Sequence, residues 1–298
     1  MKILIVGLGS VAKQHIAALK QLEIELDVYA LRSSRDALPA EGVTDLYSFS
    51  EAPQGLAFVI ISNPTHLHLQ TITEAETLGI PLFIEKPVLR HKKEITQLGD
   101  ISVPTYIACQ MRHHPCLQYV KALLGERNIK DVQIYCGSYM PDWVPGIDWK
   151  KSFRANKDMS GGVHLELIHE MDYCYWLFGD PQSISSDLRN TETLGIDIID
   201  DARYDLQYDG FSAHIEVNYV DKTPRRTLEI MFTNGSKWHV DLLNFTITEN
   251  DEEIFVSEMT RPDLFASQMQ YFLNCIASET KPMNSVQEGC KVLTLALS

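Results

Sequence analysis

Five short apolar blocks occur in the first 110 residues, and helical spacing follows most of them. The blocks cover residues 3–6, 26–31, 57–61, 81–84 and 105–109. An uninterrupted apolar block suits a strand that is buried on both faces of a parallel sheet. Because such strands alternate here with helical patterns, the first part of the chain is predicted to be a doubly wound α/β domain.

The pattern changes after about residue 115. A helix is expected at 117–124, a strand at 132–139 and a longer helix at 163–178, which Gly179-Asp180-Pro181 would end. Strands with polar and apolar alternation and short turns then fill residues 184–256, and helices are expected at 265–276 and 286–297. We therefore expect an α+β domain with an open, mainly antiparallel sheet over residues 116–298. Its outer face, with Phe232, Trp238 and Val240, is expected to be covered by another subunit in a homodimer or homotetramer.

A glycine-rich turn follows the first apolar block. In Gly7-Leu8-Gly9-Ser10-Val11-Ala12, Gly7 allows a tight turn, Gly9 allows close approach of a pyrophosphate, and Ala12 allows the helix to pack near the strand. The free N–H groups at the start of the helix favour a phosphate. The turn predicts a dinucleotide site in a Rossmann domain over residues 1–115; the alternative is a tight strand-to-helix turn without a ligand.

Composition narrows the function. The chain has 298 residues, 45% of them hydrophobic, and a net charge of −14, which argues against nucleic acid or an anionic membrane as a partner. The six cysteines show no metal-ligand spacing, so no metal is expected. The N-terminal apolar block is too short for a signal peptide, and a cytoplasmic location is expected.

The second block ends at Arg32-Ser33, the position that meets the adenosine ribose in dinucleotide-binding domains. An acidic residue there would bind the 2′-hydroxyl of NAD, whereas Arg accommodates the 2′-phosphate of NADP. Arg32 and Ser33 thus favour NADP over NAD. The alternative is that Arg32 is a solvated cation of the loop.

Two further loops follow apolar blocks at the expected carboxyl edge of the sheet, where ligands bind in such folds. The first contains Asn63-Pro64-Thr65 and His68, and the second is Glu85-Lys86-Pro87, in which proline restricts the backbone that positions the Lys86 ammonium group. Cofactor contacts are expected from both loops and from Gln110 after the fifth block. For the tripeptide alone, an ordinary polar turn is the alternative.

Polar and aromatic residues of the second part suggest substrate contacts. The segment 140–162 is too rich in Pro and Gly for regular structure, and long ordered loops are often binding loops. In the helix at 163–178, a spacing of three places Glu166, His169 and Asp172 on one face. That face is either part of a site or a solvated acidic surface. The expected substrate contacts are Arg112, His114, Trp143, Asp148, Trp149, Arg154 and Asp172.

Five motifs in order together resemble the glucose-fructose oxidoreductase / inositol dehydrogenase / MocA family of NAD(P)-dependent oxidoreductases. They are GLGSVA at residues 7–12, NPT-x-x-H ending at His68, EKP at 85–87, R-x-H-P at 112–115 and SGGVHLELIHEMDYCYWLFG at 160–179. The resemblance covers nearly the whole chain. It implies hydride transfer between a nicotinamide and a secondary hydroxyl or keto carbon of a sugar, cyclitol or nucleotide-sugar derivative.

The resemblance also implies that Lys86 and His169 are catalytic. His169 suits the base that removes the hydroxyl proton, and Lys86 would donate a hydrogen bond to the same oxygen. The family often has Asp four residues before the His, where this chain has Leu165, so Glu166 is expected to substitute. Two alternatives stay open: an NAD(P)-binding sensor without catalysis, and a lyase or epimerase that oxidises its substrate transiently with bound NAD.

Overall fold

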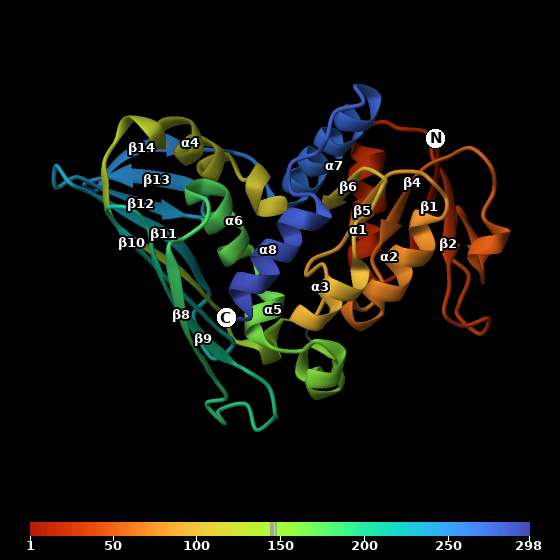
Figure 1. Cartoon of the computed structure of the whole chain (residues 1–298), viewed down its shortest axis with the longest axis horizontal. Coiled ribbons are helices and arrows are strands. Elements are labelled where there is room, and N and C mark those ends of the chain that lie inside the picture. Colours follow the sequence, from red (N-terminus) through yellow and green to blue (C-terminus); the bar gives the residue numbers. More distant parts are fainter. Residues whose placement is uncertain (144–145, 147) are drawn as a thin grey trace. The chain divides into compact units, whose positions relative to one another are not determined.

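The computed structural model describes residues 1–143, 146 and 148–298, and the chain forms two compact units (Figure 1). The first unit comprises residues 1–110 and 260–293, and the second comprises residues 111–259 and 294–298. The division expected from the sequence assigns 260–293 to the second domain, whereas the structure groups these residues with the first unit. Residues 144, 145 and 147 of the predicted binding loop lie outside the described residues.

The first unit contains a six-stranded parallel sheet in the order β3-β2-β1-β4-β5-β6. This is the order of a doubly wound Rossmann sheet, so the predicted fold is confirmed. The strand β3 was not predicted, because only Leu46 of its four residues is buried. The strands are β1 (Lys2–Val6), β2 (Asp27–Leu31), β3 (Val43–Leu46), β4 (Leu56–Ile61), β5 (Leu82–Ile84) and β6 (Thr105–Ile107).

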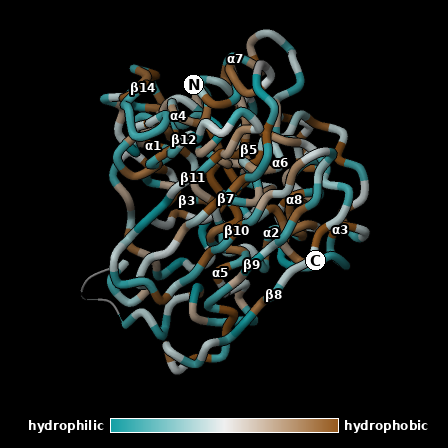
Figure 2. Tube along the Cα trace, turned by 90° about the vertical axis from the view of Figure 1, so that its left-hand side faces the viewer, coloured by the Kyte–Doolittle hydropathy of each residue, from teal (hydrophilic) through white to brown (hydrophobic). Residues whose placement is uncertain are grey.

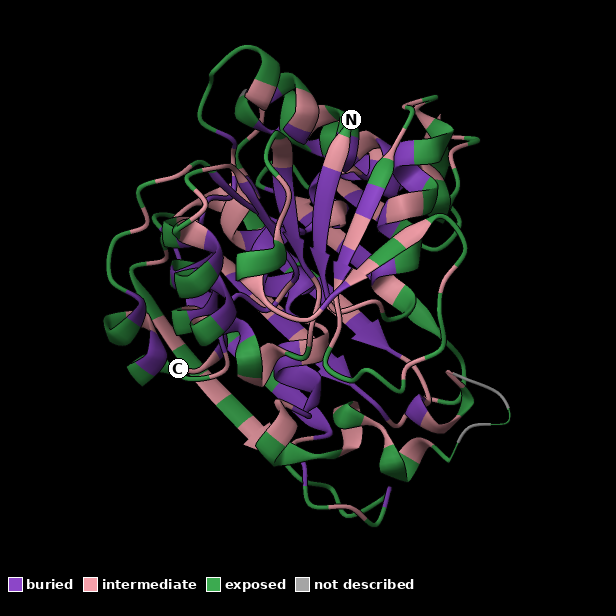
Figure 3. Ribbon diagram, turned by 90° about the vertical axis from the view of Figure 1, so that its right-hand side faces the viewer, coloured by how far each residue is buried: buried purple, intermediate pink, exposed green. Residues whose placement is uncertain are grey.

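The helices of this unit bury the central strands, which appear in purple in Figure 3. Helices α1 (Ser10–Gln21) and α7 (Arg261–Ala277) pack on one face of the sheet, where the rings of Phe58, Phe83 and Phe272 meet edge to face. Each buried aromatic side chain stabilises the fold by ~1.5–3 kcal/mol. The other helices that begin in this unit are α2 (His68–Glu76), α3 (Lys92–Leu98) and α8 (Val286–Ala296), which ends in the second unit.

The second unit contains an eight-stranded sheet in the order β14-β13-β12-β11-β7-β10-β9-β8. Of its pairings, β7 with β10 is parallel and the others are antiparallel, as predicted for a mainly antiparallel sheet. The strands are β7 (Ile129–Gly137), β8 (Ser183–Arg189), β9 (Asp201–Gln207), β10 (Ser212–Asn218), β11 (Arg225–Phe232), β12 (Lys237–Asp241), β13 (Thr246–Glu249) and β14 (Glu252–Val256).

Among the described residues, three α-helices lie wholly in the second unit, and single 3-10 turns occur in both units. The helices are α4 (Pro115–Leu123), α5 (Val163–Glu166) and α6 (His169–Phe178). The 3-10 turns are η1 (Phe49–Glu51), η2 (Thr65–Leu67), η3 (Gln110–His113), η4 (Leu124–Glu126), η5 (Met140–Asp142), η6 (Trp149–Lys151), η7 (Phe153–Ala155) and η8 (Lys157–Met159). No helix among the described residues is long and apolar enough to cross a membrane.

The two faces of the antiparallel sheet differ in polarity, and hydrophobic and hydrophilic positions interleave along its strands (Figure 2). Phe232, Trp238 and Val240, expected on an outer face, are at most 1% exposed within the single chain. That expectation was wrong, because these residues point to the face that the chain itself covers. The opposite face carries charged pairs such as Glu229 with Lys237, at 2.7 Å. These three side chains are therefore not available for contact with another subunit.

Candidate active site

The glycine-rich turn lies between β1 and α1 and has the geometry of a phosphate site. Gly7 has a φ of +83°, and a Cβ atom there would lie 2.8 Å from the Cα of Asn63, so glycine is required. Around Gly9, by contrast, a Cβ would meet no atom within 4 Å, so the space above the turn is open. Gly9 is the N-cap of α1 and no side chain caps the helix, which leaves its first N–H groups available to an anion.

The other predicted residues of this turn fit the same picture. Ser10 is exposed and Val11 is half-buried at the start of α1, while Ala12 is fully buried in the core. The turn lies where β1 has β2 on one side and β4 on the other, the switch point at which dinucleotides bind in this fold. The pyrophosphate of a nicotinamide dinucleotide fits the residues present: an open glycine turn and an uncapped twelve-residue helix.

The turn after β4 is tied to the glycine-rich turn and to the loop after β5. The Ser62 hydroxyl donates to the Gly7 carbonyl at 2.9 Å, and the Asn63 amide donates to Thr71 at 2.7 Å. Thr65 begins η2, and Pro64 is the N-cap residue before it. One ring nitrogen of His68 lies 3.0 Å from the Asn63 carbonyl, and the other lies 3.1 Å from the carbonyl of Pro87.

His68 therefore holds two loops together. Its side chain is 1% exposed, and burial lowers the pKa of its imidazole. The ring nitrogens lie close to three main-chain carbonyls, those of Asn63, Pro87 and Val88. A neutral imidazole carries one N–H and so donates from only one of its two nitrogens at a time. The residue that the sequence predicts as a cofactor contact thus lies beneath the loops, where it supports them.

The loop after β5 begins with a carboxylate that has two partners. One oxygen of Glu85 lies 2.6 Å from Nε2 of His15, and the other accepts the main-chain N–H of Lys86 at 3.2 Å. The Glu85 N–H itself donates to the Ile61 carbonyl at 2.8 Å. Glu85 therefore fixes the backbone that carries Lys86, which is half-buried.

His15 was missed by the sequence reasoning. It is fully buried on α1, with its ring edge-on to Phe83. Its position three residues after the buried Ala12 is the signal that could have identified it, because a histidine on the core face of a helix requires a buried partner.

Arg32 follows β2 as predicted, but its guanidinium is paired. Nη1 of Arg32 lies 2.7 Å from Oδ1 of Asp45 on β3, and Nη2 donates to the Leu38 carbonyl at 3.3 Å. Ser33 is exposed beside it, and Gln110 begins η3. All the predicted cofactor residues, together with Lys86, therefore belong to the first unit.

In the second unit, the predicted helix at 163–178 is two helices. Leu167 leaves the helical conformation with a ψ of +35°, so Glu166 ends α5 and His169 begins α6. The prediction that a spacing of three places Glu166 and His169 on one helix face was wrong. The break carries no Gly or Pro, so no local signal marks it in the sequence. At the start of α5, the Val163 N–H donates to the Ile199 carbonyl at 2.8 Å.

Two predicted substrate contacts instead bind each other. Nε and Nη2 of Arg112 donate to the two oxygens of Asp172 at 2.9 and 2.7 Å, and the side chains are 0% and 1% exposed. This bidentate ion pair is internal to the unit, with Asp172 on α6 one turn after His169. His169 is itself 5% exposed.

His114 also has an internal place. It caps α4 by accepting the Cys116 N–H at 3.2 Å, lies 3.2 Å from the Leu242 carbonyl, and stacks on Phe245. Burial lowers its pKa to about 4, so it is neutral at physiological pH.

In the second unit, Arg154 contacts both Trp143 and Glu166. Nε of Arg154 donates to Glu166 at 2.9 Å, and its guanidinium carbon lies 5.9 Å from the centre of the Trp143 ring. Trp143 also packs edge-on against Tyr219, a buried residue that the sequence reasoning missed. Asp148 is exposed and caps η6, and Trp149 is half-buried. We call Trp143, Arg154 and Glu166 the loop cluster.

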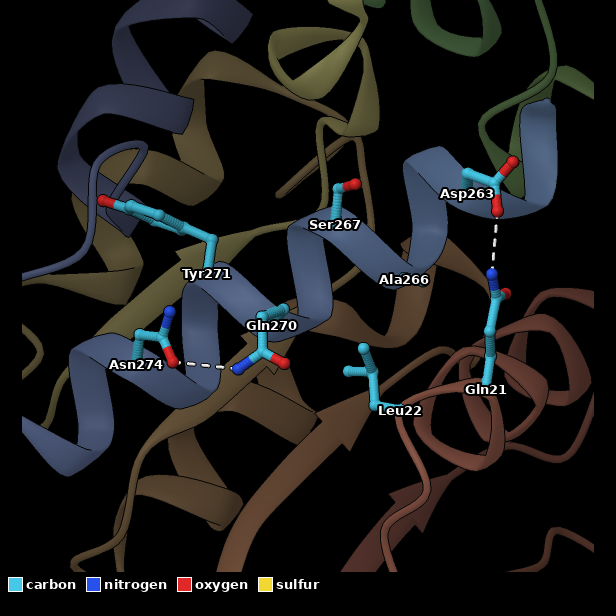
Figure 4. A pocket seen from close by; sticks show the side chains of 8 residues that line it. All are labelled: Gln21, Leu22, Asp263, Ala266, Ser267, Gln270, Tyr271 and Asn274. Atoms are coloured by element: carbon cyan, nitrogen blue, oxygen red, sulfur yellow. Dashed lines mark hydrogen bonds between the residues drawn. The ribbon is translucent and has the colours of Figure 1, made fainter. Parts of the chain in front are cut away.

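A surface pocket of the first unit lies between α1 and α7 (Figure 4). Within it, the amide of Gln21 donates to Asp263 at 2.7 Å, and the amide of Gln270 donates to Asn274 at 2.9 Å. It contains no predicted site residue. Among the described residues, no group of three or more His, Cys, Asp or Glu side chains is arranged to hold a metal ion.

Models of known protein families match a part of each unit. A model described as "Oxidoreductase family, NAD-binding Rossmann fold" matches residues 1–110, and one described as "GFO/IDH/MocA C-terminal domain" matches residues 117–237. An uncharacterized oxidoreductase of Synechocystis is 27% identical over 211 residues, which are 63% of this chain and 54% of that protein. The chain thus spans about half the length of this curated relative.

Solved structures share the fold over the full chain. UDP-N-acetylglucosamine 3-dehydrogenase from Acidithiobacillus ferrooxidans superposes with a TM-score of 0.80 at 20% identity, covering 100% of this chain and 95% of that one. Levoglucosan dehydrogenase in complex with NADH superposes with a TM-score of 0.86 at 15% identity, covering 99% and 95%.

Proposed function

Because the chain belongs to the GFO/IDH/MocA family of oxidoreductases, we propose that it transfers a hydride between a nicotinamide dinucleotide and a carbinol or keto carbon. The proposed substrate is a sugar, cyclitol or nucleotide-sugar derivative. The observation that supports this most is the open, uncapped start of α1 at the switch point of the parallel sheet, with the Lys86 loop at the same edge.

The proposed catalytic groups are Lys86 and His169. When bound, the nicotinamide supplies or accepts the hydride. His169 takes the hydroxyl proton as the carbonyl forms, and Lys86 donates a hydrogen bond to the same oxygen and stabilises its developing negative charge. Glu85, itself bound to His15, holds the main chain at Lys86 in place. This supports a role in which the Lys86 side chain starts from a fixed backbone position.

The loop cluster is proposed to bind the sugar. An aromatic face beside a guanidinium–carboxylate pair offers both an apolar surface and hydrogen-bonding groups, as ligand pockets for polar rings require. In this proposal Glu166 acts on the substrate through Arg154, its partner in the structure. The names of the similar structures, a UDP-sugar dehydrogenase and a levoglucosan dehydrogenase, support a sugar-like substrate.

The proposed location is the cytoplasm. All six cysteine side chains are buried thiols, which suits a reducing compartment. Self-association is proposed without a specific interface, because the apolar residues first expected to form it are covered by the chain itself.

The test is a panel of sugars, cyclitols and UDP-sugars offered with NAD and NADP and followed at the nicotinamide absorbance. With an active substrate, Lys86→Met is expected to lower kcat by about 10²-fold or more, since it removes the proposed hydrogen-bond donor. The exposed Lys93→Met on α3 is the matched control and should leave kcat unchanged.

Other outcomes point to the alternatives. Cofactor binding without turnover across the panel would indicate a sensor. Product formation without net change of absorbance would indicate a lyase or epimerase that reoxidises its cofactor. Near-normal turnover by Lys86→Met would remove Lys86 from the mechanism.

A further inference from the structure

The residue that follows β2 is expected to read the adenosine ribose, and in this chain it is already in an ion pair. The guanidinium of Arg32 lies 2.7 Å from the carboxylate of Asp45, and the side chains are only 12% and 17% exposed. The backbone reinforces the contact, since the Arg32 N–H donates to the Leu46 carbonyl at 2.8 Å. Asp45 faces Ala30 across the β2–β3 pairing, so the parallel sheet fixes where its carboxylate lies.

Other charges near this strand end are more exposed. Arg35 lies over the Tyr47 ring, with its guanidinium carbon 4.2 Å from the ring centre, and Asp36 is exposed after it. The Asp36 N–H donates to the Ser34 hydroxyl at 3.1 Å. Arg32 and Asp45 are therefore more buried than Arg35 and Asp36, and the opposite charges of Arg32 and Asp45 cancel each other.

We propose that Asp45 is a specificity-determining residue that lowers the affinity for NADP(H) relative to NAD(H) by pairing with Arg32. The proposal rests on the proposed function, because it requires a nicotinamide dinucleotide in the first unit. It changes the expectation from the sequence, in which Arg32 alone favours NADP.

The physical reason is charge. A 2′-phosphate carries nearly two negative charges at neutral pH, and its usual partner is an arginine with free N–H donors. Here one edge of Arg32 is taken by Asp45, and a phosphate that used the remaining donors would lie within a few ångströms of a carboxylate. That repulsion is screened weakly because the pair is partly buried. The 2′-hydroxyl of NAD is neutral and is little affected.

Asp45→Asn removes the negative charge of Asp45 and keeps the position of the Arg32 side chain. Asparagine has the size of aspartate, and its carbonyl oxygen can still accept from Nη1 of Arg32, so the arginine stays in place while the pair gains a net positive charge. Asp27→Asn is the matched control. Asp27 is exposed at the opposite end of β2, so the same charge is removed far from the ribose position.

The experiment is a fluorescence titration of the full-length protein with NADH and with NADPH. Asp45→Asn is expected to lower the Kd of NADPH about tenfold, equivalent to ~1.4 kcal/mol, and to change the Kd of NADH less than about twofold. Arg32→Gln should raise the Kd of NADPH with little effect on NADH. If Asp45→Asn does not fold, Asp45→Ser, which removes the same charge, decides the matter by the direction in which the Kd of NADPH moves. Asp27→Asn should leave the ratio of the two Kd values unchanged.

Two results would overturn the proposal. If Asp45→Asn weakens NADPH binding, Asp45 orients Arg32 for the phosphate instead of neutralising it. If the ratio of Kd values is the same in wild type, Asp45→Asn and Arg32→Gln, the pair has no part in recognition. A wild-type protein that binds neither nucleotide contradicts the proposed function itself, so the two failures are distinguishable.

Discussion

Asp172→Asn is expected to destabilise the second unit severely, even though the sequence suggested a substrate contact at this position. The substitution keeps the shape of the side chain but removes the charge that balances Arg112, which is 0% exposed. One of the two hydrogen bonds, at 2.9 and 2.7 Å, also loses its acceptor, because an amide nitrogen cannot accept a hydrogen bond.

The magnitude follows from the burial of both groups. Breaking one partner of a buried ion pair costs ~3–5 kcal/mol, because the remaining charge stays desolvated. A domain has a total free energy of unfolding of about 5–15 kcal/mol, so the loss is at least about a fifth of the total and most of it for a domain of low stability.

Urea unfolding followed by tryptophan fluorescence measures the loss of stability in the second unit, which contains the ion pair. All four tryptophans, at positions 143, 149, 176 and 238, lie in the second unit, so the signal reports on the unit that contains the pair. Asp187→Asn is the control. It removes the same charge from an exposed pair with Arg189 on β8, and the unfolding midpoint should not move.

A double variant tests whether the loss of stability comes from the unpaired charge of Arg112 or from any change at this position. Replacing both partners, Arg112→Met with Asp172→Leu, leaves no buried charge and should recover at least half of the stability lost in Asp172→Asn. A midpoint for Asp172→Asn equal to wild type, with a raised KM for substrate, would refute the structural role and restore the substrate contact.

Three further predictions concern a glycine, a set of buried histidines and His15. Gly7→Ala should weaken NADH binding tenfold or more in the fluorescence titration, because its methyl group would lie 2.8 Å from the main chain of the turn after β4. The control is Gly55→Ala, at a position with a φ of +77° and open space around it. It should lower the free energy of unfolding by about 1–2 kcal/mol and leave the affinity for NADH unchanged. Burial lowers the pKa of His113, His114 and His164 to about 4, so the unfolded chain binds their protons at a higher pH than the folded chain does. The free energy of unfolding should therefore be highest above pH ~6.5 and fall between pH ~6.5 and pH ~4. His164→Leu should make the urea midpoint depend less on pH, and an unchanged dependence would contradict the role of His164. His15→Phe should lower kcat at unchanged Kd for NADH, and His15→Gln, which can still donate to Glu85, should recover most of it; equal kcat for the two variants would deny the hydrogen bond a role.

Local patterns predict the parallel sheet well because its strands are uninterrupted apolar blocks and its first turn requires glycine. Residues 3–6 are at most 5% exposed, as a strand buried on both faces must be. The missed strand β3 is an edge strand with one buried residue, which leaves no periodicity to detect.

Contacts between distant residues explain most of the other differences. Arg112 and Asp172 are 60 residues apart, and His15 and Glu85 are 70 residues apart, so no local spacing predicts their pairing. The spacing of Glu166 and His169 suggested one helix face, but a backbone break with no Gly or Pro separates them. The sequence thus suggests candidate residues from motifs and spacing, but it does not reveal the partners that these side chains have in the structure.

The central claim is that the Lys86 amine and the His169 imidazole act on one oxygen beside the nicotinamide. A crystal structure of the protein with bound NADH and a substrate from the active panel tests it most directly. We expect Nζ of Lys86 and Nε2 of His169 both to lie within hydrogen-bond reach, ~2.6–3.2 Å, of the same substrate oxygen next to the nicotinamide C4. A complex in which either nitrogen points away from that oxygen would contradict it.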